Sequence, residues 1–374
     1  MSASVYIFSL ILFGSANLIL TRRAASYVNE PLLDYDANWT NFNVGNEDNI
    51  PPEYLHLFNH YYDSNPSVYA SDDNTAKLRF FYNSINNFTE LSMAEAHKIF
   101  SYRWYNPDKM TVFFAHGYTG HPNGPAVTAI TNFFLDEGKS NFVLVNWKDM
   151  AAMVYPSFVN SYLNWAAPNA IRLGHEFANT LLNLSSAGLD LNKTHLVGHS
   201  LGAHMFGVTG NKIQEFGVKL PWITGLDPAA AGFDAKPPHL RMQPNSAIFT
   251  VVLHSDPSKY GSRRELGLVD FWPNYKNRGQ IIQTGCPTGS HPRFSQEDLC
   301  SHNRCWQLLL DALKYPGTLI GSHARSYRMW KNYSKDERNA DVLELGTFNP
   351  NAKPGNYYFI TGGESPFGLG KNGL

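Results

Sequence analysis

The chain has 374 residues, a length that fits one large domain or two. Hydrophobic residues make up 43% of the chain and charged residues 16%, against about 25% charged in a typical globular protein, and this composition excludes an intrinsically disordered chain. The 30 basic and 31 acidic residues leave a net charge of −1, so the sequence gives no electrostatic sign of a nucleic-acid partner. Three cysteines are too few for a disulfide-rich scaffold.

The amino terminus carries an apolar run at residues 5–13 (VYIFSLILF). The run is shorter than the roughly 20 residues that a membrane-spanning helix needs, and it is typical of a signal-peptide core. Small residues follow at 14–16 (GSA), so we predict a signal peptide at residues 1–16, with cleavage as late as residue 25, and a secreted, extracellular protein. Because basic residues follow the run and none precedes it, a retained membrane anchor is the alternative.

Five N-x-S/T sequons are compatible with secretion, because such sites are glycosylated on the surface of secreted proteins. The candidate glycosylation sites are Asn38, Asn87, Asn183, Asn192 and Asn332.

Short apolar runs alternate with helix-length segments from residue 76 onward. The sequence predicts strands at 77–82, 111–115, 142–147, 195–197, 222–226 and 248–254, and helices at 126–137, about 166–184 and from 201. Such alternation indicates a mostly parallel sheet with helices on both faces. We therefore predict a single α/β domain at residues 76–374, preceded by an irregular arm at 26–75 that is rich in Asn, Asp, Tyr and Pro.

Residues 198–202 (GHSLG) form a G-x-S-x-G motif, which by itself is weak evidence. Its context is more specific, because a predicted strand precedes Ser200 and an amphipathic segment follows it. A sharp strand-to-helix turn of this kind exposes a nucleophilic serine, and the flanking glycines avoid clashes in the bend. Ser200 is therefore the candidate nucleophile.

A nucleophilic serine needs a histidine base, and the base needs an orienting carboxylate. In the strand-turn-helix arrangement these follow in the order Ser, Asp, His. Asp227 stands at the end of the next strand and is the candidate acid, with Asp270 as its rival. Spacing alone leaves five candidate bases open: His239, His254, His291, His302 and His323.

Negative charge on the acyl oxygen needs backbone N–H donors. One predicted donor is the N–H of Leu201, directly after the nucleophile at the start of a helix. The second is the N–H of Tyr118, in the loop after the strand at 111–115. We expect His116 in the same loop to be structural.

The motifs GHSLGAH, ITGLDPA, GLVDFWPN and GC…CSH, with HGYTG upstream, resemble the pancreatic-lipase-like family of triglyceride lipases, phospholipases A1 and insect yolk proteins. The similarity covers about residues 76–370. Within the family, the chain resembles secreted insect lipases most. It implies an α/β-hydrolase fold in the form that lacks the carboxy-terminal β-sandwich of vertebrate lipases.

The resemblance assigns Ser200, Asp227 and His302 as catalytic residues and supports Tyr118 and Leu201 as oxyanion donors. It implies a serine carboxylic-ester hydrolase, of phospholipase A1 or neutral lipase type, that acts on a lipid ester at an aggregate or membrane interface. The alternative is a yolk-protein-like lipid-binding or storage protein with the same fold and little or no activity.

The resemblance also implies a lid closed by a disulfide between Cys286 and Cys300. Both this lid and the surface loop at 254–270 are shorter than in pancreatic-type triglyceride lipases, which favours the phospholipase A1 reading. Cys305 is left over. Three roles remain open for it: a buried thiol, a rival disulfide to Cys286 or Cys300, or a metal ligand together with Cys300 and His302.

The segment of this chain that corresponds to the family's calcium loop is 237–246 (PPHLRMQPNS). It has no carboxylate, and calcium requires oxygen ligands of this kind. We therefore predict no calcium site and no cofactor.

Overall fold

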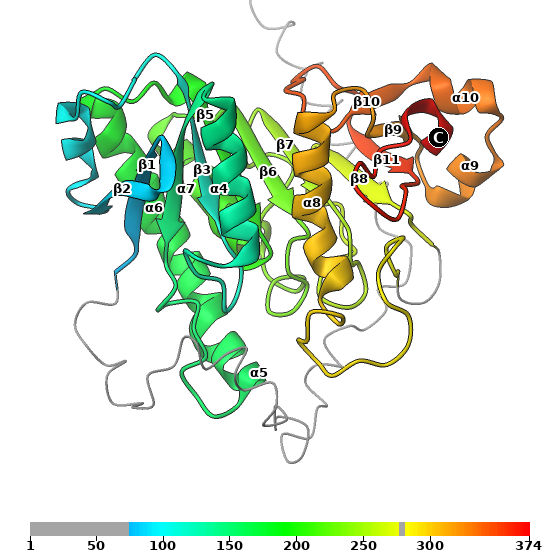
Figure 1. Ribbon diagram of the computed structural model, residues 1–374, viewed down its shortest axis with the longest axis horizontal. Coiled ribbons are helices and arrows are strands. Elements are labelled where there is room, and N and C mark those ends of the chain that lie inside the picture. Colours follow the sequence, from blue (N-terminus) through cyan, green and yellow to red (C-terminus); the bar gives the residue numbers. More distant parts are fainter. Residues whose placement is uncertain (1–74, 277–280) are drawn as a thin grey trace, which may run out of the picture. The chain divides into compact units, whose positions relative to one another are not determined.

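The computed structural model describes residues 75–276 and 281–374, which belong to one compact unit. The predicted signal peptide, the predicted arm up to residue 74 and the sequon at Asn38 lie outside the described residues. In the described part, helices pack on both faces of one central sheet (Figure 1).

The sheet has eleven strands within the described ranges, in the order β10-β9-β11-β8-β7-β6-β5-β3-β4-β1-β2. The strands are β1 (Lys77–Tyr82), β2 (Ser84–Ser92), β3 (Met110–Ala115), β4 (Ser140–Asn146), β5 (Thr194–His199), β6 (Trp222–Leu226), β7 (Phe249–Leu253), β8 (Val269–Pro273), β9 (Ile320–His323), β10 (Val342–Glu344) and β11 (Gly355–Phe359). The α-helices are α4 (Pro125–Glu137), α5 (Phe158–Ser161), α6 (Ala167–Ala187), α7 (Leu201–Ile213), α8 (Cys300–Lys314), α9 (Tyr327–Asn332) and α10 (Lys335–Ala340).

The inner strands are parallel and the outer strands antiparallel. Strands β4, β3, β5, β6, β7, β8 and β11 form one parallel series. Strand β1 pairs antiparallel with β4 and β2, and β9 pairs antiparallel with β11 and β10. The predicted mostly parallel α/β sheet is therefore confirmed. The sequence patterns did not indicate strands β2, β8, β9 and β10.

Alternate residues of the inner strands supply separate cores on the two faces of the sheet. In β3, Val112 and Phe114 join the core that α4 and α8 cover, whereas Phe113 and Ala115 join the core under α6 and α7. Side chains alternate between the faces of a strand, so a sheet covered on both sides buries every residue of a continuous apolar run. Figure 1 shows α4 and α8 in front of the sheet.

A break in helical geometry separates α5 from α6. Residues 162–166 form a single wide π-type turn, and Pro168 follows at the start of α6. Proline has no N–H to donate, so the regular bond to the carbonyl of Asn164 cannot form, and the helix widens there. The turn positions Phe158 and Tyr162, whose rings both contact Tyr118.

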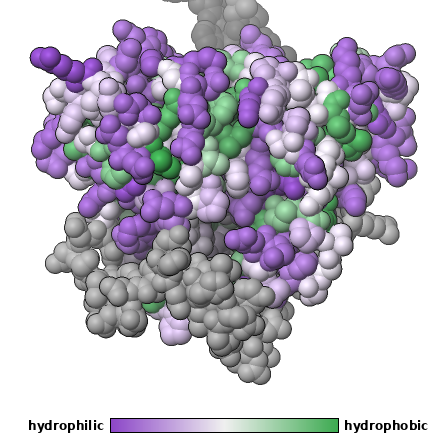
Figure 2. Space-filling model, viewed as in Figure 1, coloured by the Kyte–Doolittle hydropathy of each residue, from purple (hydrophilic) through white to green (hydrophobic). Residues whose placement is uncertain are grey.

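The surface in Figure 2 is mostly hydrophilic, with hydrophobic side chains in small groups between. Among the described helices, none has both the length and the apolar character that crossing a membrane requires. The carboxyl ends of the parallel strands meet along one edge of the sheet, and the candidate site is built there.

Candidate active site

Ser200 stands at the junction of β5 and α7 with φ 55° and ψ −116°, a conformation that non-glycine residues rarely adopt. Its N–H donates to the carbonyl of Leu226 at 2.9 Å, which ties the turn to the end of β6. A Cβ atom on Gly198 would lie 2.3 Å from the carbonyl oxygen of Gly202, and one on Gly202 would lie 2.3 Å from that of Ala115. The two glycines therefore allow α7 to begin directly after the strand.

Asp227 follows β6, the strand next to β5, and its side chain is fully buried. Its N–H donates to the carbonyl of Leu253 at 2.8 Å, so the turn after β6 is held by β7. Its Oδ1 accepts the backbone N–H groups of Ser255 at 2.8 Å and Asp256 at 2.9 Å. These bonds leave Oδ2 for a second partner.

That partner is His302, in the first turn of α8, whose Nδ1 lies 2.6 Å from Oδ2 of Asp227. The His302 ring also lies 4.8 Å, centroid to centroid, from the ring of His199, the residue before Ser200. The structure thus joins Asp227 to His302, the histidine that the family resemblance assigned, and places His302 beside the residue that precedes Ser200. Among the five candidate histidines, it is His302 that reaches Asp227.

The rival acid, Asp270, is bonded to another candidate histidine. Its Oδ1 lies 2.8 Å from Nε2 of His254, and both side chains are at most 1% exposed. His254 also bonds the carbonyl of Ser262 through Nδ1 at 3.0 Å, and its ring stacks on Trp272 at 3.7 Å. This pair is a structural element of β7 and β8.

The three remaining candidate histidines lie in other parts of the fold. His239 is exposed in a short turn at Pro238–Leu240. His323 ends β9, where it bonds the carbonyl of Pro354 at 3.3 Å. His291 lies in the loop between the cysteines, and its Nε2 is buried without a hydrogen-bond partner among the described residues.

The predicted oxyanion loop lies against the nucleophile. A Cβ on Gly117 would lie 2.7 Å from Cβ and 3.3 Å from Oγ of Ser200. The next residue is Tyr118, and Thr119 anchors the loop by donating its N–H to the carbonyl of Ala151 at 2.8 Å. The predicted donor, the N–H of Tyr118, therefore belongs to the residue next to Gly117, which lies against Ser200.

His116 supports this loop from inside the protein. Its Nδ1 lies 2.9 Å from the carbonyl of Gly117, and its ring stacks on Trp147 at 5.5 Å. Burial lowers the pKa of His116 to about 4, so the ring is neutral at physiological pH. These contacts agree with the expected structural role.

The loop after β7 contributes groups that sequence reasoning missed. Asp256 is fully buried, and neither of its carboxylate oxygens has a well-formed hydrogen bond among the described residues. Burial and the neighbouring Asp227 raise the pKa of Asp256 well above its ordinary value. Lys259 and Tyr260, in the same loop, both reach Asp298 in the loop between the cysteines. No motif in the sequence indicated these contacts.

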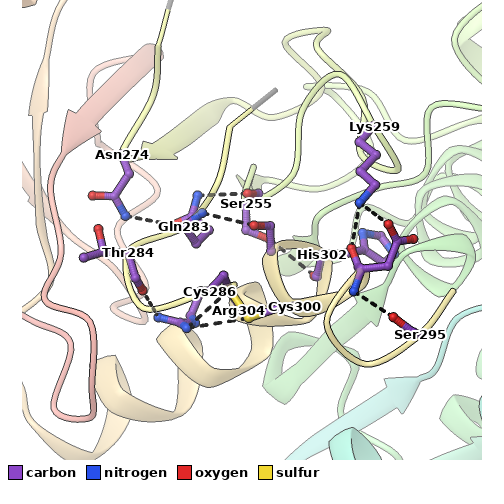
Figure 3. Close-up of a disulfide and its surroundings, with 12 residues drawn as sticks. Ser255, Lys259, Asn274, Gln283, Thr284, Cys286, Ser295, Cys300, His302 and Arg304 are labelled. Carbon is purple, nitrogen blue, oxygen red and sulfur yellow. Dashed lines mark hydrogen bonds and ion pairs between the residues drawn. A yellow bond between two sulfur atoms is a disulfide. The ribbon is translucent and has the colours of Figure 1, made fainter. Parts of the chain in front are cut away.

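Cys286 and Cys300 form a disulfide at the start of α8, in agreement with the expected pairing. Cys300 stands two residues before His302 in the chain. Figure 3 shows Arg304 beside the sulfur atoms. Arg304 donates to the carbonyl of Thr284 at 2.7 Å and contacts Sγ of Cys286 at 3.5 Å. The disulfide and Arg304 together fix the segment before α8.

Cys305 is a buried free thiol that donates to the carbonyl of His302 at 3.0 Å. The described residues contain no group of three or more His, Cys, Asp or Glu side chains placed to hold a metal ion. Since Cys300 is bonded to Cys286, the alternative metal site with Cys305 does not form.

Side chains already donate hydrogen bonds to backbone carbonyl oxygens in the loop at 237–246. The amide of Asn211 donates to three carbonyl oxygens within this loop, at 2.9 to 3.3 Å. The Arg241 guanidinium donates to the carbonyls of Lys236 and Met242. A hard cation would have to compete with these donors for oxygen atoms. The absence of a calcium site remains a prediction.

Residues 54–367 match the sequence model of the family described as Lipase. Lipase member H-A of Xenopus laevis is 33% identical over 231 residues, which cover 62% of this chain and 47% of that protein. Phospholipase A1 of Vespa crabro is 30% identical over 263 residues, which cover 69% of this chain and 83% of that protein. The chain spans about half the length of the lipase member H relatives it matches.

Two solved structures show partial likeness. The mouse alpha/beta hydrolase domain-containing protein 10 matches 40% of this chain and 70% of its own, with 14% identity and a TM-score of 0.27. A phospholipase/carboxylesterase from Dyadobacter fermentans matches 40% of this chain and 66% of its own, with 14% identity and a TM-score of 0.25. The α/β-hydrolase fold itself follows from the sheet order and the helices on both faces.

Proposed function

The chain belongs to the lipase family, and on that premise we propose that it is a carboxylic-ester hydrolase that acts on lipids. The observation that carries the proposal is the hydrogen bond between Asp227 and His302, with His302 beside the strained turn of Ser200. A serine hydroxyl becomes a useful nucleophile when a histidine accepts its proton and a carboxylate orients that histidine. We assign these roles to Ser200, His302 and Asp227.

In the proposed reaction, Oγ of Ser200 attacks the ester carbonyl while Nε2 of His302 takes the hydroxyl proton. Oδ2 of Asp227 accepts the Nδ1–H of His302, which selects the tautomer and stabilises the imidazolium. The N–H groups of Leu201 and Tyr118 are the proposed donors to the oxyanion. His302 then protonates the departing alcohol, and a water molecule activated by His302 hydrolyses the acyl-enzyme.

The proposed substrate is a phospholipid or neutral lipid ester presented at an aggregate or membrane interface. Support comes from the lipase family match and from the similarity to a protein named phospholipase A1. The aromatic side chains of Tyr118, Phe158 and Tyr260 near the proposed reaction centre offer apolar surface that suits an acyl chain.

We also propose that the protein is secreted and needs no metal. A disulfide persists in oxidising compartments, and the four sequon asparagines in the described residues are all exposed. The carbonyls of the loop at 237–246 are hydrogen bonded to Asn211 and Arg241, which supports activity without calcium.

Hydrolysis of phosphatidylcholine and triolein, measured side by side, tests the proposed reaction. We expect Ser200→Ala to abolish fatty-acid release, whereas Ser186→Ala, at an exposed serine of α6, leaves it unchanged. A fluorophosphonate probe should label the folded wild type and not Ser200→Ala. Equal release by the wild type and Ser200→Ala would contradict the mechanism, and a preference for triolein would contradict only the phospholipase A1 reading.

A further inference from the structure

A row of aromatic rings joins the two sides of the proposed reaction centre. The ring of Tyr118 lies 4.6 Å from that of Phe158, which stacks on Phe294 at 3.7 Å. The ring of Phe294 lies 5.5 Å from that of Tyr260, which in turn lies 5.5 Å from the ring of His302. Side chains from the oxyanion loop, α5, the disulfide-closed loop and the loop after β7 therefore form one continuous set of contacts.

Phe294 is the member of this row that comes from the loop between the cysteines. Its φ of 64° is unusual for a bulky side chain, so surrounding contacts must hold it there. The stack on Phe158 is face to face, with 25° between the ring planes, which leaves no room for an acyl chain between the rings. A long chain that takes this path has to displace Phe294.

Asp298 holds the loop that carries Phe294. The backbone N–H of Phe294 donates to Oδ2 of Asp298 at 2.9 Å, so the loop is tied back on itself. Lys259 donates to Oδ1 of Asp298 at 2.6 Å, and the hydroxyl of Tyr260 also donates to this carboxylate. Figure 3 shows Lys259 and Ser295 on the same side of the start of α8 as His302.

The carboxylate of Asp298 links the loop after β7 to the loop between the cysteines. The residue is 8% exposed, so solvent screens its contact with Lys259 less than it would screen a surface ion pair. Its two oxygens accept donors from the loop after β7 and from its own loop. Loss of the charge would loosen both attachments while leaving the disulfide and His302 in place.

We propose that Phe294 is a specificity-determining residue that restricts long acyl chains at Ser200, and that Asp298 is the positioning residue that keeps Phe294 against Phe158. The inference rests on the proposed ester hydrolysis and deepens it, because it names the part of the substrate that is selected. A short ester reaches Ser200 without moving Phe294, whereas a long chain must break the stack.

Labelling of Ser200 in the full chain by butyl and dodecyl fluorophosphonates tests the proposal without requiring turnover. In this reaction the serine oxygen bonds to phosphorus, fluoride leaves, and the hydroxyl proton passes to His302. The quantity measured is the ratio of the dodecyl labelling rate to the butyl labelling rate, below the concentration at which the dodecyl probe forms micelles.

We expect Phe294→Ala to raise this ratio about tenfold, since accepting even one more methylene group in an apolar site changes rates by about tenfold or more. Phe294→Leu and Asp298→Asn should raise it about threefold, in line with the loss of a modest contact or hydrogen bond. Glu297→Gln is the matched control, because it removes one negative charge from an exposed neighbour of Asp298 and should leave the ratio unchanged.

An unchanged ratio in Phe294→Ala, with butyl labelling and circular dichroism like those of the wild type, would overturn the inference and leave the proposed function standing. If Phe294→Ala does not fold, Phe294→Leu decides the same question. A response of Asp298→Asn no larger than that of Glu297→Gln would overturn the positioning role. Absence of labelling in the wild type would overturn the proposed function and this inference with it.

Discussion

Two buried His–Asp pairs lie near the carboxyl ends of neighbouring strands, and only one of them adjoins the strained serine. His302 and Asp227 are joined at 2.6 Å, and His254 and Asp270 at 2.8 Å. Both carboxylates also accept two backbone N–H groups, so the two pairs are nearly alike in hydrogen bonding. The pairing of a histidine with an aspartate therefore does not by itself identify a catalytic base.

The difference lies in what the second ring nitrogen does. Both nitrogens of His254 are bonded, to Asp270 and to the carbonyl of Ser262, and Trp272 covers one face of the ring. Within the described residues, the His302 ring is hydrogen bonded through Nδ1 alone, which leaves Nε2 for the proton exchange that we propose. A base needs one nitrogen held and one available, whereas a structural histidine uses both.

The largest expected effect is on catalysis. Asp227→Asn should lower kcat about 10⁴-fold, because an amide in place of the carboxylate favours the wrong tautomer of the histidine. The matched variant Asp270→Asn should change kcat less than about threefold when it is measured per active site. A soluble short-chain ester, with fluorophosphonate titration of active sites, gives both numbers. Comparable losses of kcat in the two variants would remove the distinction between the pairs.

The second expected effect is on stability, and here the pair of His254 and Asp270 is expected to matter more than the pair of His302 and Asp227. His254→Ala should lower the free energy of unfolding by about 3–5 kcal/mol, since it leaves a buried carboxylate without its partner and opens a cavity beside Trp272. His302→Ala should cost less, about 1–2 kcal/mol. It also leaves the buried carboxylate of Asp227 without its partner, but the His302 side chain is 8% exposed, so water can enter the vacated space and solvate that carboxylate. Urea unfolding of both variants measures the difference. A greater loss of stability in His302→Ala would show that the proposed catalytic pair contributes more to the stability of the fold than the pair of His254 and Asp270.

The strand-to-helix turn at Ser200 and the acid at Asp227 could be predicted because each depends on residues adjacent in the chain. An apolar strand followed by a glycine-flanked serine specifies the turn locally. The base could not be selected this way. Five histidines satisfied the chain order, and only the packing of α8 against the strand ends brings His302 to Asp227. The family resemblance supplied what spacing could not.

Among the features that escaped prediction, two illustrate the physical reasons. Strand β2 (SINNFTELS) is largely polar because it lies at the edge of the sheet, where one face and one side meet solvent, so it lacks the apolar pattern of an inner strand. The contact of Lys259 with Asp298 joins residues 39 positions apart in two irregular loops. No periodicity relates such positions, and the contact exists only once the disulfide-closed loop is folded.

The smallest expected effect concerns a second carboxyl group beside Asp227. Asp256 donates its N–H to Asp227, while its own buried carboxyl lacks a well-formed hydrogen bond among the described residues. Burial first, and then the charge of Asp227, raise the pKa of Asp256 well above its ordinary value, although Lys259 opposes this. The folded state therefore favours the neutral acid. This contribution to stability is fully present below about pH 4 and is lost as the pH rises through the raised pKa.

Asp256→Asn keeps the shape of the side chain and cannot ionise, so the stability of the variant relative to the wild type should improve as the pH rises from 4 to 9. We expect a relative gain in Tm of about 1 °C at the upper end, which corresponds to less than about 1 kcal/mol for a chain of this size. Thermal unfolding of both proteins across the range measures it, with Asp108→Asn at an exposed position as the matched control. A difference that narrows or reverses toward high pH would mean that Asp256 is ionised in the folded protein. The pair of Asp227 and His302 would then lie beside a second negative charge, that of Asp256.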